Sequence, residues 1–333
     1  MEQVSETFTV DLRRLTVLRE LQRRGSLARA AEALHLTPSA VSQQIAALAR
    51  EAGVPLTERD GRGVRLTGQA RVLLTHADLI AAQLERARAD LASYGEGGGR
   101  ASVTVGALSS GILGLLPGAL AALAERLPHV RIDVVESQPP DLFTALDAGQ
   151  VDVAVAVDFP ATPPHTDRRY ARTDLLTDVL DLAVPADHRL ADRDRVALRE
   201  LATDPWIVGD ADSCCGAVTR TVCAAAGFTP DIRHAVNDWG ALAALIEAGQ
   251  GVALIPRMVQ PLYAHRRLTL LTPDGTPPTR NVFMAVRTGS ESDPVLTAVQ
   301  EQLLAAATEL SNRQLTNRQA RPSTGVRRSP RSP

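Results

Sequence analysis

Apolar residues recur at helical spacing through the first fifty positions, in three successive groups. The groups are Leu12, Leu15, Leu18 and Leu21, then Ala30, Ala31 and Leu34, then Val41, Ile45 and Leu48. Gly25 is a helix-ending residue, Ser26 is a good N-cap for a second helix, and Thr37-Pro38 suits the start of a third. The short connection between the second and third helices predicts a helix-turn-helix.

A small wing is predicted next, over residues 55–67, where arginines alternate with glycines. A long helix then extends from about residue 67 to 94. Its apolar residues are spaced 4-3-4-3-4, at Leu73, Ala77, Ile80, Leu84, Ala87 and Leu91. This heptad spacing is consistent with packing on the helix's own domain and favours pairing with a second copy of the chain.

The glycine-rich segment Gly95–Gly99 ends this helix as a flexible joint. It does not follow a strand or open a helix, so it is not a phosphate-binding loop. Beyond it, short Val-rich strands alternate with helices, which predicts parallel sheets with right-handed crossovers. Two sets of these elements predict two α/β lobes with a cleft between them.

The sequence therefore predicts an α/β protein that starts with an all-α winged helix-turn-helix and a long linker helix. The expected divisions are a winged helix-turn-helix domain at 10–66, a linker and dimerisation helix at 67–94, a Gly-rich hinge at 95–100, a two-lobed domain at 101–310 (lobe I at 101–174 and 281–310, lobe II at 175–280), and a disordered Arg-rich tail at 311–333.

Charge is distributed unevenly along the 333 residues. Residues 12–75 hold eleven Arg and five acidic residues, a net charge of +6, whereas residues 96–310 have a net charge of −10. This asymmetry suggests that the basic N-terminal part, residues 12–75, binds a polyanion and that the acidic part, residues 96–310, does not. All 36 basic residues are Arg, and the absence of Lys excludes a Walker P-loop and Schiff-base chemistry.

Several other signals are absent. Three Cys are too few for a disulfide framework, and the first residues contain no apolar signal-peptide region. No uninterrupted apolar run approaches the length of a membrane span. We therefore expect a soluble cytoplasmic protein. No motif calls for a cofactor or a metal ion, and no catalytic residue is nominated, so we do not expect an enzyme.

The third helix is expected to carry the DNA contacts, because the second helix of a helix-turn-helix enters the major groove. Gln43 can bond adenine through two hydrogen bonds, and Ser side chains reach bases or phosphates. Arginines of the wing supply phosphate contacts that fix register. The candidate DNA-binding residues are Ser26, Thr37, Pro38, Ser39, Ser42, Gln43, Gln44, Arg59, Arg62 and Arg65.

The stretches SLARAAEALHLTPSAVSQQIAALARE and LTERDGRGVRLTGQA resemble the winged helix-turn-helix of LysR-type transcriptional regulators. In place of the family's usual wing aromatic, this chain has Thr57. The resemblance extends over about residues 10–308 and implies a linker helix followed by a two-lobed domain similar to periplasmic binding proteins. It also implies double-stranded DNA, a small-molecule effector and a second copy of the chain (dimer or tetramer) as partners.

Ligands of two-lobed α/β proteins bind where strands end. Ser109 and Ser110 follow the first strand of the body, and Asn237 and Asp238 follow a strand of the other lobe. By the family's likeness, these four residues are the candidate effector contacts. Helix capping is the competing interpretation. Because Asp238 is negatively charged, a cationic, amino or polar ligand is as consistent with these residues as an anionic ligand.

Two alternatives remain open. Cys214 and Cys223 are nine residues apart, similar to the spacing in peroxide-sensing members of the family, so a thiol-based redox regulator is one alternative. A disulfide between them requires local rearrangement if both lie in a helix. The other alternative, of a different class, is a small-solute-binding module or an enzyme, which would keep its activity without residues 1–95.

Overall fold

The structure, a computed structural model, describes residues 10–61, 63–93, 101–210 and 213–320. The chain divides into two compact units, Met1–Ala87 and Arg88–Pro333, each with its own apolar core. The glycine-rich segment at 95–99 and the end of the Arg-rich tail lie outside the described residues.

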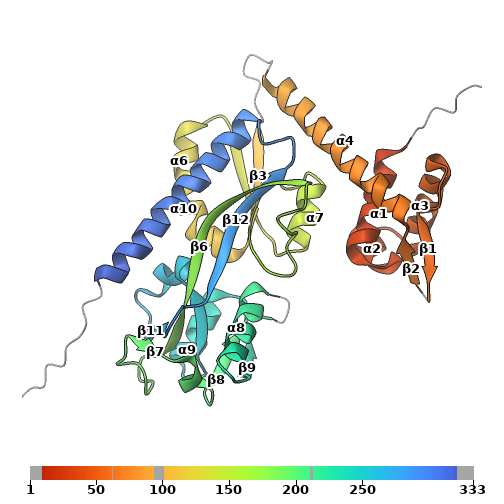
Figure 1. Cartoon of the computed structure of the whole chain (residues 1–333). Helices are drawn as coiled ribbons and strands as arrows, with labels where there is room; N and C mark the ends of the chain where they lie inside the picture. Colours follow the sequence, from red (N-terminus) through yellow and green to blue (C-terminus); the bar gives the residue numbers. More distant parts are fainter. Residues whose placement is uncertain (1–9, 62, 94–100, 211–212, 321–333) are drawn as a thin grey trace, which may run out of the picture. The chain divides into compact units, whose positions relative to one another are not determined.

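The first unit contains three short helices, a two-stranded hairpin and the beginning of a long helix (Figure 1). These elements are α1 (Leu12–Arg24), α2 (Leu27–Ala33), α3 (Pro38–Ala52), β1 (Thr57–Asp60), β2 (Gly63–Leu66) and α4 (Gly68–Ser93). Short polar side chains cap the first three helices: Asp11, Ser26 and Thr37 each accept a hydrogen bond from a backbone N–H of the first turn. Gly25, at φ 70°, ends α1 in the left-handed conformation that glycine adopts without strain.

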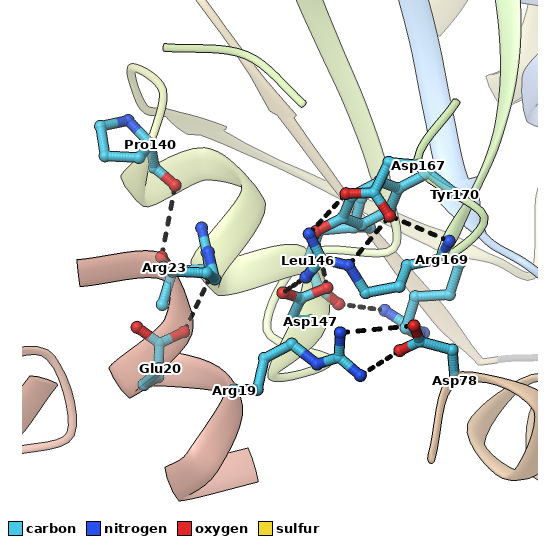
Figure 2. A network of polar contacts seen from close by, with 12 residues as sticks. Arg19, Glu20, Arg23, Asp78, Pro140, Leu146, Asp147, Asp167, Arg169 and Tyr170 are labelled. Carbon is cyan, nitrogen blue, oxygen red and sulfur yellow. Dashed lines mark hydrogen bonds and ion pairs between the residues drawn. The ribbon is translucent and has the colours of Figure 1, made fainter. Parts of the chain in front are cut away.

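The core of the first unit joins all three short helices, the hairpin and the first half of α4. Leu56 and Leu66 of the hairpin segment are buried in it, and so is Leu74 of α4. Arg19 of α1 forms an ion pair with Asp78 of α4 (Figure 2). Arg19 also donates to the Leu74 carbonyl at 3.0 Å. The start of α4 is therefore anchored to the helices that precede it.

The second unit is α/β (Figure 1). Its elements are β3 (Ser102–Ala107), α5 (Ser109–Gly114), α6 (Leu116–Arg126), β4 (Arg131–Glu136), α7 (Asp141–Asp147), β5 (Val153–Val157), β6 (Tyr170–Pro185), β7 (Arg195–Val196), η1 (Leu198–Leu201), β8 (Pro205–Val208), α8 (Cys214–Ala225), β9 (Asp231–Ala235), α9 (Trp239–Glu247), β10 (Ala253–Pro256), η2 (Arg257–Tyr263), β11 (Leu268–Pro273), β12 (Thr279–Arg287) and α10 (Pro294–Ala320).

Two long antiparallel strands, β6 and β12, connect the two lobes of this unit. One half of β6 pairs with β12 beside the parallel strands β5, β3 and β4 of the first lobe. The other half of β6 pairs with β10 and β11 of the second lobe, which also holds the parallel pair β8–β9. Both lobes therefore share the backbone of a single 16-residue strand.

Polar contacts fix the start of β6 against α7 in the first lobe (Figure 2). Arg169 donates to Asp147 at 2.7 Å and to Asp167 at 2.6 Å, and the hydroxyl of Tyr170 donates to Asp147 at 2.7 Å. The Arg169 guanidinium also lies over the Tyr170 ring. These contacts hold the strand where it enters the sheet.

The structure corrects two expectations. The large sheet is mixed instead of parallel, because β6 and β12 run in opposite directions through it. The region from Ser311 onward is not all irregular, since α10 continues to Ala320. Residues 311–320 contain no Gly or Pro and several good helix formers, so nothing in them ends the helix.

Candidate functional site

The third helix of the first unit has one buried face and one exposed face. Val41, Ile45 and Leu48 are buried in the core. Ser42 and Gln43 are exposed on the opposite side, near the N-terminal end of the helix. This is the arrangement by which a helix-turn-helix presents polar side chains to the major groove.

The other candidate DNA-binding residues around α3 have different surroundings. Ser26 and Thr37 serve as helix caps, accepting from the backbone N–H groups of Arg29 at 3.3 Å and Ala40 at 3.1 Å. Pro38 and Ser39 are exposed in the first turn of α3. Gln44 is also exposed, and its Oε1 accepts a hydrogen bond from Nε of Arg14 at 3.2 Å.

The predicted wing is the β1–β2 hairpin, paired from Thr57↔Leu66 to Asp60↔Gly63. Its arginines are not equivalent. Arg65 pairs with Glu58 on the facing strand at 2.9 Å, so its charge is partly neutralised. Arg59 is exposed, and no ion pair to it is found among the described residues. Arg62 lies outside the described residues.

The predicted apolar stripe of α4 divides between two environments. Leu73 and Ala77, in its first half, pack on the core of the first unit. Ile80 and Leu84, one and two turns further on, are 45% and 55% exposed. Leu79 is 56% exposed as well. Apolar side chains at this spacing on a long helix are typical of a surface that another helix covers.

A cavity of about 510 Å³, including its open mouth, lies in the second unit where strands of both lobes end. Residues following β3, β8 and β9 contribute to its wall, as do α8, α9 and β12. Its lining consists of Leu108, Ser109, Ser110, Gln138, Ile207, Val208, Gly209, Ser213, Cys214, Cys215, Thr219, Val236, Asn237, Trp239, Leu242, Leu254 and Arg280.

Three of the four candidate effector residues line this cavity: Ser109, Ser110 and Asn237. The side chain of Asn237 also contacts Asp210, donating to its carboxylate and accepting from its backbone N–H at 3.1 Å. Asp238 is not part of the lining. Its carboxylate caps α9 by accepting a hydrogen bond from the N–H of Ala241 at 2.7 Å, as the capping interpretation of Asp238 predicts.

The sequence did not point to Arg280 and Trp239, the two largest polar side chains of the wall. Arg280 is on β12 and donates from Nε and Nη2 to Oδ2 of Asp178 on β6, at 3.1 and 2.9 Å. Both side chains are buried. A charged residue just before the apolar run of β12 was the available signal, but its partner is 102 positions away.

The three cysteines all belong to α8 and are free thiols. Burial is the largest cause that raises the pKa of Cys214, to about 12. Burial also raises the pKa of Cys223 to about 12. Nine residues of helix separate these two residues by about 13 Å along the axis, so α8 must unwind before they bond. The thiols are therefore held in the neutral, weakly nucleophilic form.

Comparisons with known proteins identify both units. The family described as "Bacterial regulatory helix-turn-helix protein, lysR family" matches residues 12–71, and "LysR substrate binding domain" matches residues 96–308. The chain belongs to the LysR family of transcriptional regulators. It is a DNA-binding regulator with an effector-binding domain, so the expectation of a regulator instead of an enzyme is confirmed.

Relatives of this LysR-type regulator include a probable hydrogen peroxide-inducible genes activator of Mycobacterium avium, 30% identical over 79% of this chain and 84% of that protein. The transcriptional dual regulator GltC of Bacillus subtilis is 29% identical over 74% of this chain and 81% of its own length. Among solved structures, a Corynebacterium glutamicum OxyR C206 mutant superposes with a TM-score of 0.57 at 22% identity, covering 94% of this chain and 96% of that one.

No helix among the described residues has the length and hydropathy needed to cross a bilayer. In the same part of the chain, His, Cys, Asp and Glu side chains form no group of three or more that could hold a metal ion.

Proposed function

We propose that this LysR-family regulator recognises duplex DNA through the exposed face of α3. The observation that carries the proposal is the division of that helix: its apolar residues are buried in the first unit, whereas Ser42 and Gln43 face outward at its N-terminal end. Gln43 is suited to an adenine edge in the major groove, and Ser39 and Ser42 to bases or phosphates.

Phosphate contacts come from the wing and from the caps of the helix-turn-helix. Arg59 is exposed in β1, and the backbone N–H groups at the start of α3 carry the positive end of the helix dipole. Residues 12–75 have a net charge of +6, so non-specific affinity for DNA depends strongly on salt.

Two copies of the chain associate through α4 in this proposal. The exposed side chains of Leu79, Ile80 and Leu84 form the contact. Each copy then holds one DNA-binding unit, and because Arg19 and Asp78 anchor α4, the angle between two paired α4 helices sets the spacing of two α3 helices. Half-site spacing on DNA follows from such a symmetric arrangement.

The cavity of the second unit holds a small-molecule effector, with Ser109, Ser110 and Asn237 in its wall. A ligand that binds one arrangement of the lobes more tightly shifts the population toward that arrangement, and the shift is limited by the difference in affinity. Because its partner in this proposal is DNA, we expect this regulator to act in the cytoplasm.

Fluorescence anisotropy of the full-length protein tests the proposal. We expect tight, salt-dependent binding to a duplex from the promoter upstream of its own gene, and at least tenfold weaker binding to a shuffled duplex of the same composition. Equal affinity for the two duplexes at physiological salt would refute sequence recognition by this protein.

A further inference from the structure

We infer that the effector cavity is built for a small molecule carrying an oxyanion, held by the sulfur-facing edge of Arg280 and by the indole N–H of Trp239. The inference rests on the proposed function, because it assumes that this cavity is where the effector binds. It goes further in assigning the ligand's chemical class and the two side chains that recognise it.

The first observation is the charge of the wall. Among the described residues that line the cavity, Arg280 is the one charged side chain, and no carboxylate is present. The nearby acidic groups are occupied elsewhere: Asp238 caps α9, and Asp210 is bonded to Asn237. Asp178, outside the lining, is paired with Arg280, so a cationic ligand would find no unpaired carboxylate in the described wall.

The second observation is the incomplete bonding of Arg280. Its Nε and Nη2 donate to Asp178, its Nη2 also contacts Sδ of Met258 at 3.1 Å, and its Nη1 is directed at Sγ of Cys215, 3.6 Å away. Thiol and thioether sulfurs are weak hydrogen-bond acceptors. One edge of the guanidinium is thus bonded to a carboxylate, while the other faces sulfur atoms and has no oxygen partner among the described residues; the side chain lines the cavity. A ligand carboxylate is the partner that fits this edge.

The third observation is independent of Arg280. Trp239, at the start of α9, lines the cavity and is only 8% exposed. Its Nε1–H is enclosed and has no hydrogen-bond partner within the described parts of the chain. Buried donors in folded proteins are nearly always bonded, and an indole nitrogen can only donate. The missing partner is therefore an acceptor, which is the same chemistry that Arg280 requires.

The remaining wall determines the rest of the ligand. Six aliphatic side chains line the cavity: Leu108, Ile207, Val208, Val236, Leu242 and Leu254. The wall also contains neutral polar side chains: Ser109, Ser110, Gln138, Ser213, Thr219 and Asn237. The aliphatic side chains offer contact to a hydrocarbon body, and the neutral polar ones offer hydrogen bonds but no charge for a second ionic group. The ligand class is accordingly a compact monoanion with one oxyanion group and an apolar body.

Three probes of matched shape test this class on the full-length protein: hexanoate, hexanamide and hexylammonium. We expect hexanoate, at millimolar concentration and constant ionic strength, to raise the melting temperature, and the other two probes to leave it unchanged. Trp239→Phe keeps the ring and removes the N–H, so it should weaken hexanoate binding about tenfold.

Trp206→Phe is the matched control, because the Trp206 indole donates to the Leu201 carbonyl at 3.1 Å in the core of the second lobe and does not line the cavity. We expect it to lower stability and to leave hexanoate affinity unchanged. Because the chain has two Trp, Trp239 is then the sole indole, and its emission should shift as hexanoate binds.

The outcomes separate the inference from the proposed function. Stabilisation by hexanamide or hexylammonium equal to that by hexanoate would overturn the oxyanion class while leaving an effector cavity in place. Unchanged hexanoate affinity in Trp239→Phe would overturn the indole contact. If no probe is bound, the inference is wrong, whereas the DNA-binding function is measured separately by anisotropy and is unaffected.

Discussion

Arg280 and Asp178 form a buried ion pair between β12 and β6, with Nη2 and Oδ2 2.9 Å apart. The two strands that carry the pair are the ones shared by both lobes. The backbone N–H of Met258 also donates to Asp178, at 3.1 Å. The pair therefore ties three segments of the second unit together at the cavity, whose wall includes Arg280.

Breaking this pair should destabilise the second unit strongly. In Arg280→Met, Asp178 is left as an uncompensated buried charge, and we expect the free energy of unfolding to fall by about 3–5 kcal/mol in urea titrations. In the double variant with Asp178→Leu, most of that loss should be recovered. Arg233→Met, which removes an exposed pair with Asp231, is the control and should have no measurable effect. If Arg280→Met unfolds at nearly the same urea concentration as the unmodified protein, the ion pair does not contribute to the stability of the second unit.

Replacing Gln43 should alter sequence preference more than affinity for DNA in general. Gln43→Ala removes the side chain placed to read a base edge, at a cost of about 1–3 kcal/mol in discrimination. Anisotropy with specific and shuffled duplexes should show the ratio of the two affinities falling. Gln83→Ala, an exposed change on α4, is the control. An unchanged ratio would show that Gln43 is not on the reading face.

The two described wing arginines should differ in their effect on salt dependence. Arg59→Ala should weaken all duplexes about equally and lower the slope of log affinity against log salt by about 1. Arg65→Ala should have a smaller effect, because Glu58 already neutralises part of the Arg65 charge. Equal slopes for the two variants would contradict the assigned difference between the arginines.

Cys214 should be slow to react at neutral pH. Burial raises its pKa to about 12, so at pH 8 the thiolate fraction is about a thousandfold lower than for an ordinary thiol of pKa 9. Iodoacetamide labelling followed by mass spectrometry should be slow on the native protein and fast in urea.

The raised pKa of Cys214 also makes the stability of the fold depend on pH. Because the folded state favours the neutral thiol, the contribution of Cys214 to the free energy of unfolding is complete below about pH 9 and is lost as the pH rises towards 12. Labelling of native Cys214 at the unfolded rate at pH 8 would contradict the burial effect.

A charge on the exposed face of α4 should prevent self-association. Leu84→Glu places a carboxylate where we propose helix–helix contact, and we expect about tenfold or more weaker association in sedimentation velocity. Gln22→Glu adds the same charge at an exposed position of α1, away from this face, and serves as the control. If the Leu84 variant sediments like the unmodified protein, another surface forms the contact.

The helix-turn-helix could be predicted because its signals are local. Caps such as Ser26 and Thr37, and buried positions such as Val41 and Ile45, are each determined within a few residues of the helix they define. The alternation of strands and helices in the second unit was readable for the same reason. Strand direction was not, because nothing within β12 indicates that it runs opposite to β5 and β6.

The cavity was predictable only in part. Ser109, Ser110 and Asn237 follow strands, and the rule that ligand sites form at strand ends led to them. Trp239 resembles an ordinary core residue of α9, and Arg280 acquires its meaning from Asp178, far away in the chain. Pairings of this kind depend on tertiary packing, which no local pattern encodes.

The 16-residue strand β6 also limits how this protein can be recombined with others. No loop separates the lobes on that side, so any chimera joined there would interrupt hydrogen bonding on both flanks of one continuous strand. The two lobes can consequently be exchanged only as one piece. A chimera with a relative has to replace both lobes together or leave both intact.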